Sequence, residues 1–589
     1  MTPGNKTVRR LMERSQAKRM RCGEGQRPRR GIELSNRSRI RYLSMPRGSN
    51  MSKFLRRLGL TLLVLAACAD VSIGAPAVPD PGDWPAYNRT LAGDRYSPLA
   101  EIDAANVGRL KLHCVFTLPK VVSFQTGPLV IRGTMYFTSF EGSYAIDASS
   151  CKEKWTRHDK SSGPPGLAVN RGFAYLDGRL YRGTGDGHVI ALDAGDGHLL
   201  WDHKLDVAGP GISVPMAPIA ANGRIYVGNA GGDTVGVTGH VYALDARDGH
   251  VIWRFDVVPE RGHARSTWTN RKLPISGGAF WTSFTLDEAR DILYVPAGNP
   301  APDFDSLDRT GEDLYADSVI AIDAASGRML GYNQLVKRDS HDWDVNSPPT
   351  LATTRDGREI IASANKDGLL SILDRSKVGR WAAASGDRVP VIPLLSQTPT
   401  TTRENVDVPL SREHPVHFCP GMGGGTEWNG AAYSPQTDSL FVGAVDLCAK
   451  VQLVRELKVL SPGASWFGST GSIAEIIDPS STARGWLTAF DAENGHVRWK
   501  FKASHPILAG VTPAGADLVF AADLGGDVFA LDQMNGRVLW RASTGQPIGG
   551  GLVVYRADGH EFLAVASGMK SSAWQGAAEK SRILVYGLR

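Results

Sequence analysis

The chain has 589 residues, of which 42% are hydrophobic and 21% are charged, so it can build a large folded core and is not a disordered protein. Its formal net charge of +6 is unevenly distributed, because residues 1–50 carry 14 Lys and Arg against 3 Asp and Glu, which leaves −5 for residues 51–589. The positive charge therefore belongs to the N-terminal tail, and we expect no nucleic-acid binding by the folded part.

Residues 51–75 have the pattern of an export signal. A segment that begins at Met51 and contains Lys53, Arg56 and Arg57 precedes an apolar run from Leu58 to Ala67. This run is too short for a stable membrane-spanning helix. No comparable run follows, so we expect no transmembrane segment in the mature chain. Because export signals stand at the very N-terminus, we expect translation to begin at Met51. The alternative is that residues 1–50 are a basic, disordered extension.

Two cleavage sites fit this signal. Leu65-Ala66-Ala67-Cys68 resembles a bacterial lipobox, in which Cys68 would receive a lipid, whereas cleavage after Gly74 would leave the protein without one. Both alternatives place the folded part outside the cytoplasm, in the periplasm.

The cysteines agree with an exported protein. Cys22 and Cys68 lie in the tail and the signal, and the sequence has no CxxCH for covalent c-type haem and no CxxC for thiolate zinc or dithiol chemistry. An even set in an exported chain suggests two disulfides. The simplest pairs among the remaining cysteines are Cys114–Cys151 and Cys419–Cys448.

A repeat sets the architecture of the remaining chain. Apolar residues typical of strands are followed by Asp, a turn with Gly and, in most copies, Trp, as in Ala191-Leu192-Asp193, Gly197 and Trp201. The repeated aspartates are Asp147, Asp193, Asp245, Asp323, Asp374, Asp491 and Asp532. A step of about 45 residues suits one four-stranded propeller blade.

Two longer steps need an interpretation. The step from Asp245 to Asp323 contains an insertion around residues 299–316, and we expect the 117-residue step from Asp374 to Asp491 to hold two units, one of them degenerate at Ala431–Gly443. This gives eight units. The sequence therefore predicts an all-β, eight-bladed β-propeller formed by a single domain, residues 76–589, in which each Trp docks on a neighbouring blade. The terminal strand Ile583–Tyr586 is expected to complete a blade begun near the N-terminus.

Six short motifs interrupt the repeats in a fixed order. They are Asn170-Arg171-Gly172, Gly228–Gly239, Gly277-Gly278-Ala279-Phe280-Trp281, Gly298-Asn299-Pro300-Ala301-Pro302, Ser340-His341-Asp342-Trp343-Asp344 and Asn365-Lys366-Asp367-Gly368. Together with the Trp-docked repeat, this order resembles the quinoprotein alcohol dehydrogenases, which bind pyrroloquinoline quinone (PQQ) and Ca²⁺ at the propeller axis. The resemblance runs from Trp84 to the C-terminus.

The resemblance implies a role for each motif. Arg171 would grip a PQQ carboxylate, Trp281 would form the floor under the quinone ring, and Lys366 would contact the quinone oxygens. Ala230, Gly231 and Gly232 belong to the loop that supports the quinone. The implied metal ligands are Asp233, Asn299 and Asp344, with Asp344 also the catalytic base. Oxygen ligands of this kind suit a hard cation.

The sequence departs from the family at several of these positions. Gln125 stands where a PQQ-contacting Glu is usual, and Glu427, next to Trp428, stands where Asn is common. We expect Gln125, Glu427 and Trp428 to contact the cofactor all the same. The family's two adjacent cysteines above the quinone are replaced by Pro165 and Gly166, and Leu508 replaces an expected Trp.

The implied activity is oxidation of an alcohol or aldehyde by hydride transfer to Ca²⁺-bound PQQ, with electrons passed to a separate cytochrome c. Calcium is expected because relatives that use lanthanides carry an extra Asp two residues beyond the catalytic one, where this chain has Asn346. The alternative from a different functional class is a non-catalytic propeller scaffold or binding protein, with or without a lipid anchor at Cys68.

Overall fold

The computed structural model describes residues 80–161, 167–207, 209–269, 272–379, 389–571, 574, 576 and 579–588, all in one compact unit. The predictions for the extension at 1–50, the signal at 51–75, Cys68 and the pair Pro165 and Gly166 lie outside these residues.

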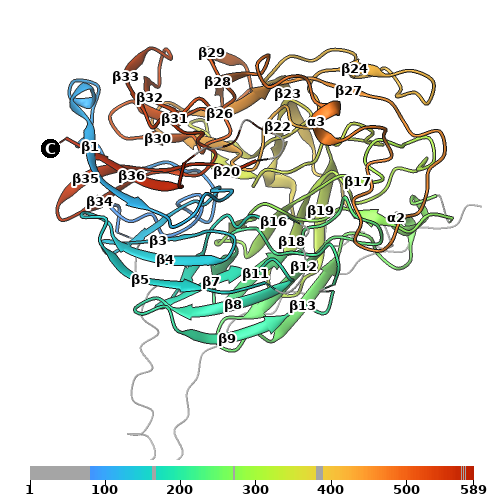
Figure 1. The fold of residues 1–589 in the computed structure, drawn as a ribbon, viewed down its shortest axis with the longest axis horizontal. Helices are drawn as coiled ribbons and strands as arrows, with labels where there is room; N and C mark the ends of the chain where they lie inside the picture. The colour runs from blue at the N-terminus through green and yellow to red at the C-terminus, as the bar shows by residue number, and fades with distance from the viewer. Residues whose placement is uncertain are drawn as a thin grey trace, which may run out of the picture. The chain divides into compact units, whose positions relative to one another are not determined.

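Eight four-stranded antiparallel sheets form the blades of a β-propeller, as predicted. In seven of them the strands follow one another in chain order (Figure 1). Their first strands are short and mostly buried, and their fourth strands are more exposed than the two strands before them. The first four of these sheets are β2 (Leu129–Ile131), β3 (Thr134–Thr138), β4 (Gly142–Asp147), β5 (Glu153–His158); β6 (Ala174–Leu176), β7 (Arg179–Gly183), β8 (His188–Asp193), β9 (Leu199–Lys204); β10 (Ile219–Ala221), β11 (Arg224–Gly228), β12 (His240–Asp245), β13 (Val251–Asp256); and β15 (Thr285–Asp287), β16 (Ile292–Ala297), β18 (Ser318–Asp323), β19 (Met329–Gln334).

The next three sheets continue the same order. They are β20 (Thr350–Thr353), β21 (Glu359–Ala364), β22 (Leu369–Asp374), β23 (Leu394–Pro399); β25 (Ala431–Ser434), β26 (Ser439–Asp446), β28 (Arg484–Asp491), β29 (Val497–Ala503); and β30 (Thr512–Ala514), β31 (Leu518–Ala522), β32 (Asp527–Asp532), β33 (Val538–Ser543).

The eighth blade joins the two ends of the described chain. Three of its strands come from the C-terminal region, and its outer strand comes from the N-terminal one, in the order β34, β35, β36, β1. Their bounds are β34 (Leu552–Ala557), β35 (His560–Ser567), β36 (Arg582–Gly587) and β1 (Lys111–Thr117). The predicted strand Ile583–Tyr586 thus lies in β36, in a blade built from both ends of the chain, as expected.

One repeat unit was wrongly assigned. The residues Ala431–Gly443 are not a separate degenerate blade, because β25 and β26 pair with β28 and β29 in the same sheet. The long step from Asp374 to Asp491 is therefore one blade whose strands are separated by insertions. The predicted total of eight is still correct because two errors cancel. The blade that closes the ring lacks the Asp repeat and is missing from the predicted units, and the unit at Ala431–Gly443 takes its place in the count.

The repeated Trp docks a blade on the next in the copies where its hydrogen bond is described, as predicted. The indole nitrogens of Trp155, Trp201 and Trp253 donate to the carbonyl oxygens of Ala194, Ala246 and Ala324 at 3.1, 3.2 and 3.0 Å. Each acceptor is the residue after the repeated Asp of the following blade. Apolar clusters lie between neighbouring blades, as where Tyr181 and Val189 of the second blade join Ile225 of the third. The core is therefore distributed between the blades.

Short elements decorate this frame. They are η1 (Val107–Arg109), α2 (His263–Ser266), η2 (Arg375–Lys377), α3 (Ile473–Ile476) and two two-stranded sheets, β14 (Ser276–Gly277) with β17 (Pro300–Ala301) and β24 (Val416–Phe418) with β27 (Ala449–Val451). None of the helices in the described ranges is long and apolar enough to cross a membrane.

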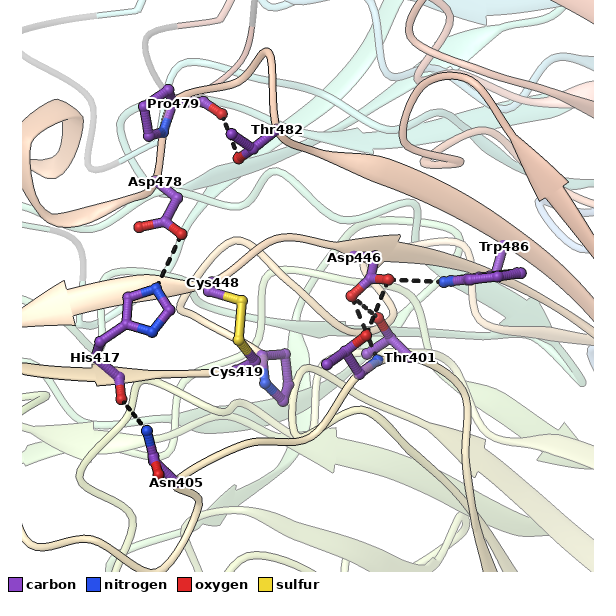
Figure 2. The surroundings of a disulfide bond; sticks show 12 residues. Thr401, Asn405, His417, Cys419, Asp446, Cys448, Asp478, Pro479, Thr482 and Trp486 are labelled. Atoms are coloured by element: carbon purple, nitrogen blue, oxygen red, sulfur yellow. Dashed lines mark hydrogen bonds and ion pairs between the residues drawn. A yellow bond between two sulfur atoms is a disulfide. The ribbon is translucent and has the colours of Figure 1, made fainter.

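Both predicted disulfides are present. Cys114 pairs with Cys151, and Cys419 pairs with Cys448 at the end of the β24–β27 ribbon (Figure 2). Near the second disulfide, Asp446 accepts hydrogen bonds from the Thr401 hydroxyl and the Trp486 indole, both at 2.9 Å. The segment that follows Cys419 leads directly to Trp428, so the disulfide anchors the start of that segment.

Candidate functional site

A cavity of about 340 Å³ contains all of the residues that the sequence predicted for the site. Its wall includes Gln125, Arg171, Ala230, Gly231, Gly232, Asp233, Trp281, Asn299, Asp344, Lys366, Glu427 and Trp428. Most of these residues directly precede the first strand of a blade or directly follow its second strand. Because adjacent strands of a blade run antiparallel, these positions lie at the same end of the sheets. The topology therefore brings residues from six blades together.

Lys366 and Asp344 form an ion pair inside this cavity. The Lys366 Nζ atom lies 2.7 Å from Oδ2 of Asp344 and 2.9 Å from Oδ1 of Asp342, and all three side chains are buried. Burial alone would lower the pKa of Lys366, but the carboxylates of Asp342 and Asp344 raise this pKa well above its usual value. The lysine is therefore a fixed positive charge at neutral pH.

The backbone holds Asp344 in one orientation. Its Oδ1 atom accepts hydrogen bonds from the Asn299 backbone at 3.1 Å and from the Trp281 indole at 3.3 Å. Gly298 allows this approach, because a Cβ atom there would lie 2.4 Å from the same carboxylate oxygen. The loop before Asp344 is held by Asp339, which accepts from the backbone nitrogens of His341 and Trp343, both at 3.0 Å.

Arg171 lies between two indole rings. Its guanidinium carbon is 4.9 Å from the Trp281 ring centroid and 5.1 Å from that of Trp428, and its Nη1 donates to the Trp281 carbonyl at 2.6 Å. The Trp428 indole is fixed in turn by a 2.9 Å hydrogen bond to the Gly549 carbonyl. Burial lowers the pKa of Arg171 to about 10, which still leaves it protonated at neutral pH. A planar aromatic ligand and an anionic group both find partners here.

Two acidic groups of the wall have raised pKa values. Burial, with the negative charge of Asp344, raises the pKa of Glu427 to about 7. The Asp233 side chain is open to the cavity, yet the protein mass around the cavity and the charge of Asp344 raise its pKa to about 6. Carboxylates crowded into a protein interior in this way favour a bound cation.

Several polar atoms of the wall lack a partner within the described chain. They include Nε of Arg171 and Oε1 of Gln125, both of them buried. Outside the wall, Oδ1 of Asn346, whose Nδ2 atom donates to Glu427, also lacks a partner among the described residues. Unpartnered donors and acceptors on residues that line one cavity are an expected feature of a site that binds a polar ligand. The residues present thus fit a flat, anionic, oxygen-rich molecule such as PQQ together with a hard cation.

The sequence reasoning missed part of the wall. Asp342 and the apolar residues Met422, Phe467, Ile473, Ile477 and Trp574 also line the cavity. Asp342 belongs to the motif Ser340-His341-Asp342-Trp343-Asp344, so the sequence does contain a signal for it. The apolar residues come from segments outside the repeats, including α3, and no motif marks them. Leu508, noted only as a departure from the family, packs in one cluster with Trp428 and Met569.

Comparisons with known proteins support the same assignment. Residues 84–379 match the model of the PQQ family described as the glucose/ethanol/alcohol dehydrogenase β-propeller domain, and residues 483–586 match a repeat model named for the outer membrane protein assembly factor BamB. A quinohemoprotein alcohol dehydrogenase of Pseudomonas putida is 28% identical over 90% of this chain and 81% of its own. A lanthanide-dependent methanol dehydrogenase of Methylacidiphilum fumariolicum is 27% identical over 76% of this chain and 78% of its own.

Solved structures share the fold. The quinohemoprotein alcohol dehydrogenase of Comamonas testosteroni superposes with a TM-score of 0.76 at 24% identity, covering 86% of this chain and 80% of its own. A europium-containing methanol dehydrogenase gives a TM-score of 0.75 at 23% identity, covering 86% of this chain and 98% of its own. From the family match, the cavity and the shared propeller, we conclude that this chain belongs to the PQQ-dependent alcohol dehydrogenase family.

Proposed function

We propose that this protein oxidises an alcohol or an aldehyde with PQQ and Ca²⁺ bound in the cavity, and passes the electrons singly to a separate cytochrome c. The observation that carries this proposal is the cavity itself, in which Asp344, Lys366 and Arg171 lie together with two indole rings. The names of the relatives, which include quinohemoprotein alcohol dehydrogenases, support the reaction class.

The residues around the cavity have complementary roles in holding the cofactor. Arg171 is placed to bind a carboxylate, and Trp281 and Trp428 supply aromatic faces for a flat ring system. Gly231, with φ of +112°, lies where a Cβ atom would come within 2.1 Å of the Gly211 carbonyl oxygen, so only glycine allows the loop this close approach. The ligands that the resemblance implies for the metal are Asp233, Asn299 and Asp344, and calcium remains the proposed ion because Asn346 adds no charge.

When bound, PQQ would accept the substrate hydride at a carbonyl that the metal polarises. Asp344 would remove the proton from the substrate hydroxyl as general base. Its fixed orientation, set by Asn299 and Trp281, serves that role because a base must be aimed at the proton that it accepts. Lys366 would place its positive charge beside the oxygen on which negative charge develops.

The proposed location is the periplasm, reached through the signal at residues 51–75. The two disulfides, Cys114–Cys151 and Cys419–Cys448, support it because such bonds persist in oxidising compartments. The proposed acceptor is a separate cytochrome because the sequence contains no CxxCH motif of its own.

Reconstitution tests the proposal directly. Purified protein is mixed with PQQ and CaCl₂, freed of unbound quinone, and examined for quinone absorbance and for alcohol-dependent reduction of an artificial electron acceptor. We expect one PQQ per chain and turnover with an alcohol or aldehyde. A protein that retains no PQQ would exclude the enzyme and leave the scaffold alternative.

A further inference from the structure

Asp303 is an acidic residue that the site described above does not use. It follows β17, its side chain is 0% exposed, and neither of its carboxylate oxygens has a hydrogen-bond partner among the described residues. The Asp303 backbone nitrogen donates to the Trp466 carbonyl at 3.3 Å, and the Trp466 backbone nitrogen donates to the Asp233 carbonyl at 2.7 Å. These two hydrogen bonds connect the Asp303 backbone to the Asp233 loop. An unpartnered buried carboxylate is costly for the fold, and this one lies directly beside the cavity wall.

The Asp303 carboxylate points into a cluster with two others. Asp233, Asp303 and Asp342 each offer a carboxylate oxygen, and these three atoms all lie within 4.8 Å of one another. Like charges at this separation repel strongly. The nearby cation is Lys366, and its Nζ atom contacts Asp342 and Asp344. Asp233 and Asp303 have no ion pair with a basic side chain among the described residues.

Asp344 is engaged in a different way. Its Oδ1 accepts from Asn299 and Trp281, and its Oδ2 accepts from Lys366. Asp344 therefore has protein donors for both oxygens, whereas Asp303 has none for either in the part of the chain that the structure describes. An oxygen already held by a protein donor is less available to a metal ion than one that has no partner.

We propose that a hard cation of calcium's size is held by the three carboxylates of Asp233, Asp303 and Asp342. This set differs from the one that the resemblance implies, because it replaces Asn299 and Asp344 as ligands and leaves Asp344 to accept the substrate proton. Calcium favours several carboxylate oxygens at one site, and its affinity depends on how many of them are charged. Asp303 and Asp342 thus add negative charge to that of Asp233, which the neutral Asn346 does not. The inference rests on the proposed function only where it places a quinone beside the ion. The binding of the ion itself does not depend on the proposed function.

The test is isothermal titration of EDTA-stripped protein with CaCl₂, with and without PQQ, in the parent and in Asp303→Asn, Asp344→Asn and Asp305→Asn. Asp305 is the matched control because it lies in the same segment and is equally buried, yet it pairs with Arg412 at 3.0 Å. We expect Asp303→Asn to weaken Ca²⁺ binding at least about tenfold, and the other two variants to bind within about threefold of the parent.

Thermal unfolding of the metal-free proteins separates a ligand from a structural residue. Asp303→Asn removes an unpartnered carboxylate, so its metal-free melting temperature should equal or exceed that of the parent, while Asp305→Asn should melt lower because it leaves Arg412 without that partner. Asp303→Asn with parental Ca²⁺ affinity, or Asp344→Asn with the larger loss, would overturn the inference. A parent that binds no Ca²⁺, with or without PQQ, would also overturn it. A parent that binds Ca²⁺ through Asp303 but no PQQ would leave the inference standing and defeat the proposed function.

Discussion

His341 and Trp343 stack face to face in the loop that carries Asp344. Their ring centroids are 4.1 Å apart at an interplanar angle of 15°, and Phe418 meets His341 edge-on at 4.5 Å. Burial, with the nearby positive charge of Arg403, lowers the pKa of His341 to about 4. The neutral ring thus supports the loop by packing against Trp343 and Phe418.

This shift predicts an acid-dependent loss of stability. Well above pH 6.5 the histidine is neutral in both states and contributes nothing to the pH dependence. Between pH 6.5 and 4 the unfolded chain takes up a proton that the folded chain does not, so stability falls as the pH falls. At pH 4.5, urea unfolding should show that the free energy of unfolding of His341→Phe has fallen by about 2–3 kcal/mol less than that of the parent. The reason is that phenylalanine keeps an aromatic ring but does not titrate. Equal pH profiles in parent and variant would contradict the shift.

The charge on the cation provides a second prediction at this scale. La³⁺ resembles Ca²⁺ in its preference for oxygen but carries one more charge, so it loses more when a carboxylate is removed. We expect La³⁺ and Ca²⁺ to compete for one site and Asp303→Asn to weaken La³⁺ binding more than Ca²⁺ binding. Competition titrations measure both affinities, and an equal loss for the two ions would contradict this dependence on the charge of the ion.

The sequence could predict the residues within motifs but not their neighbours in space. Arg171, Trp281 and Lys366 stand in short motifs beside strand ends, and the propeller topology brings such positions together. Asp303 could not be predicted in this way. It lies in the insertion of residues 299–316, and its nearness to Asp233 depends on contacts through Trp466, which comes from another insertion far along the chain.

At the scale of the element, the repeated Gly and Trp form one joint between blades. Gly249, with φ of +78°, lies so close to Trp201 of the preceding blade that a Cβ atom would come within 2.7 Å of the ring. Gly223, with φ of +73° in the same blade, has open space around the same position. The two glycines therefore share a backbone conformation but differ in packing.

This pair gives a matched stability test. Alanine at either position costs the strain of a left-handed conformation, about 1–2 kcal/mol. Gly249→Ala should cost a further ~1–3 kcal/mol because the methyl group pushes the docked indole away. Guanidinium unfolding compares the two variants. Equal losses would mean that the joint adapts without cost and that the Gly serves only the turn.

The Cys419–Cys448 disulfide predicts a local effect. It closes a span of 29 residues, so replacing both cysteines by serine should lower stability by about 3 kcal/mol. Because Met422, Glu427 and Trp428 of this span line the cavity, the same change should also weaken PQQ retention. Replacing Cys114 and Cys151, in the region where the ring closes, should lower stability without weakening PQQ retention. Parental retention in both double variants would contradict this role.

At the scale of the whole molecule, closure of the ring explains what the repeat pattern could and could not predict. The pattern identified seven blades through their Asp and turn. The eighth blade lacks that signal because its outer strand, β1, comes from the other end of the chain, and its β1–β36 pairing replaces the usual fourth-strand hairpin. Long-range pairing of this kind leaves no local pattern, which is why the degenerate unit at Ala431–Gly443 was counted in its place.

The central claim is that the cavity binds PQQ and that Asp344 acts there as the base, and single-turnover kinetics of Asp344→Asn test it most directly. The amide keeps the shape of the carboxylate but cannot take the substrate proton. After loading with PQQ and CaCl₂, the variant should retain one quinone per chain, seen by its absorbance, and oxidise alcohol about 10²–10⁴ times more slowly than the parent. A loaded variant that oxidises alcohol at the parental rate would contradict the claim.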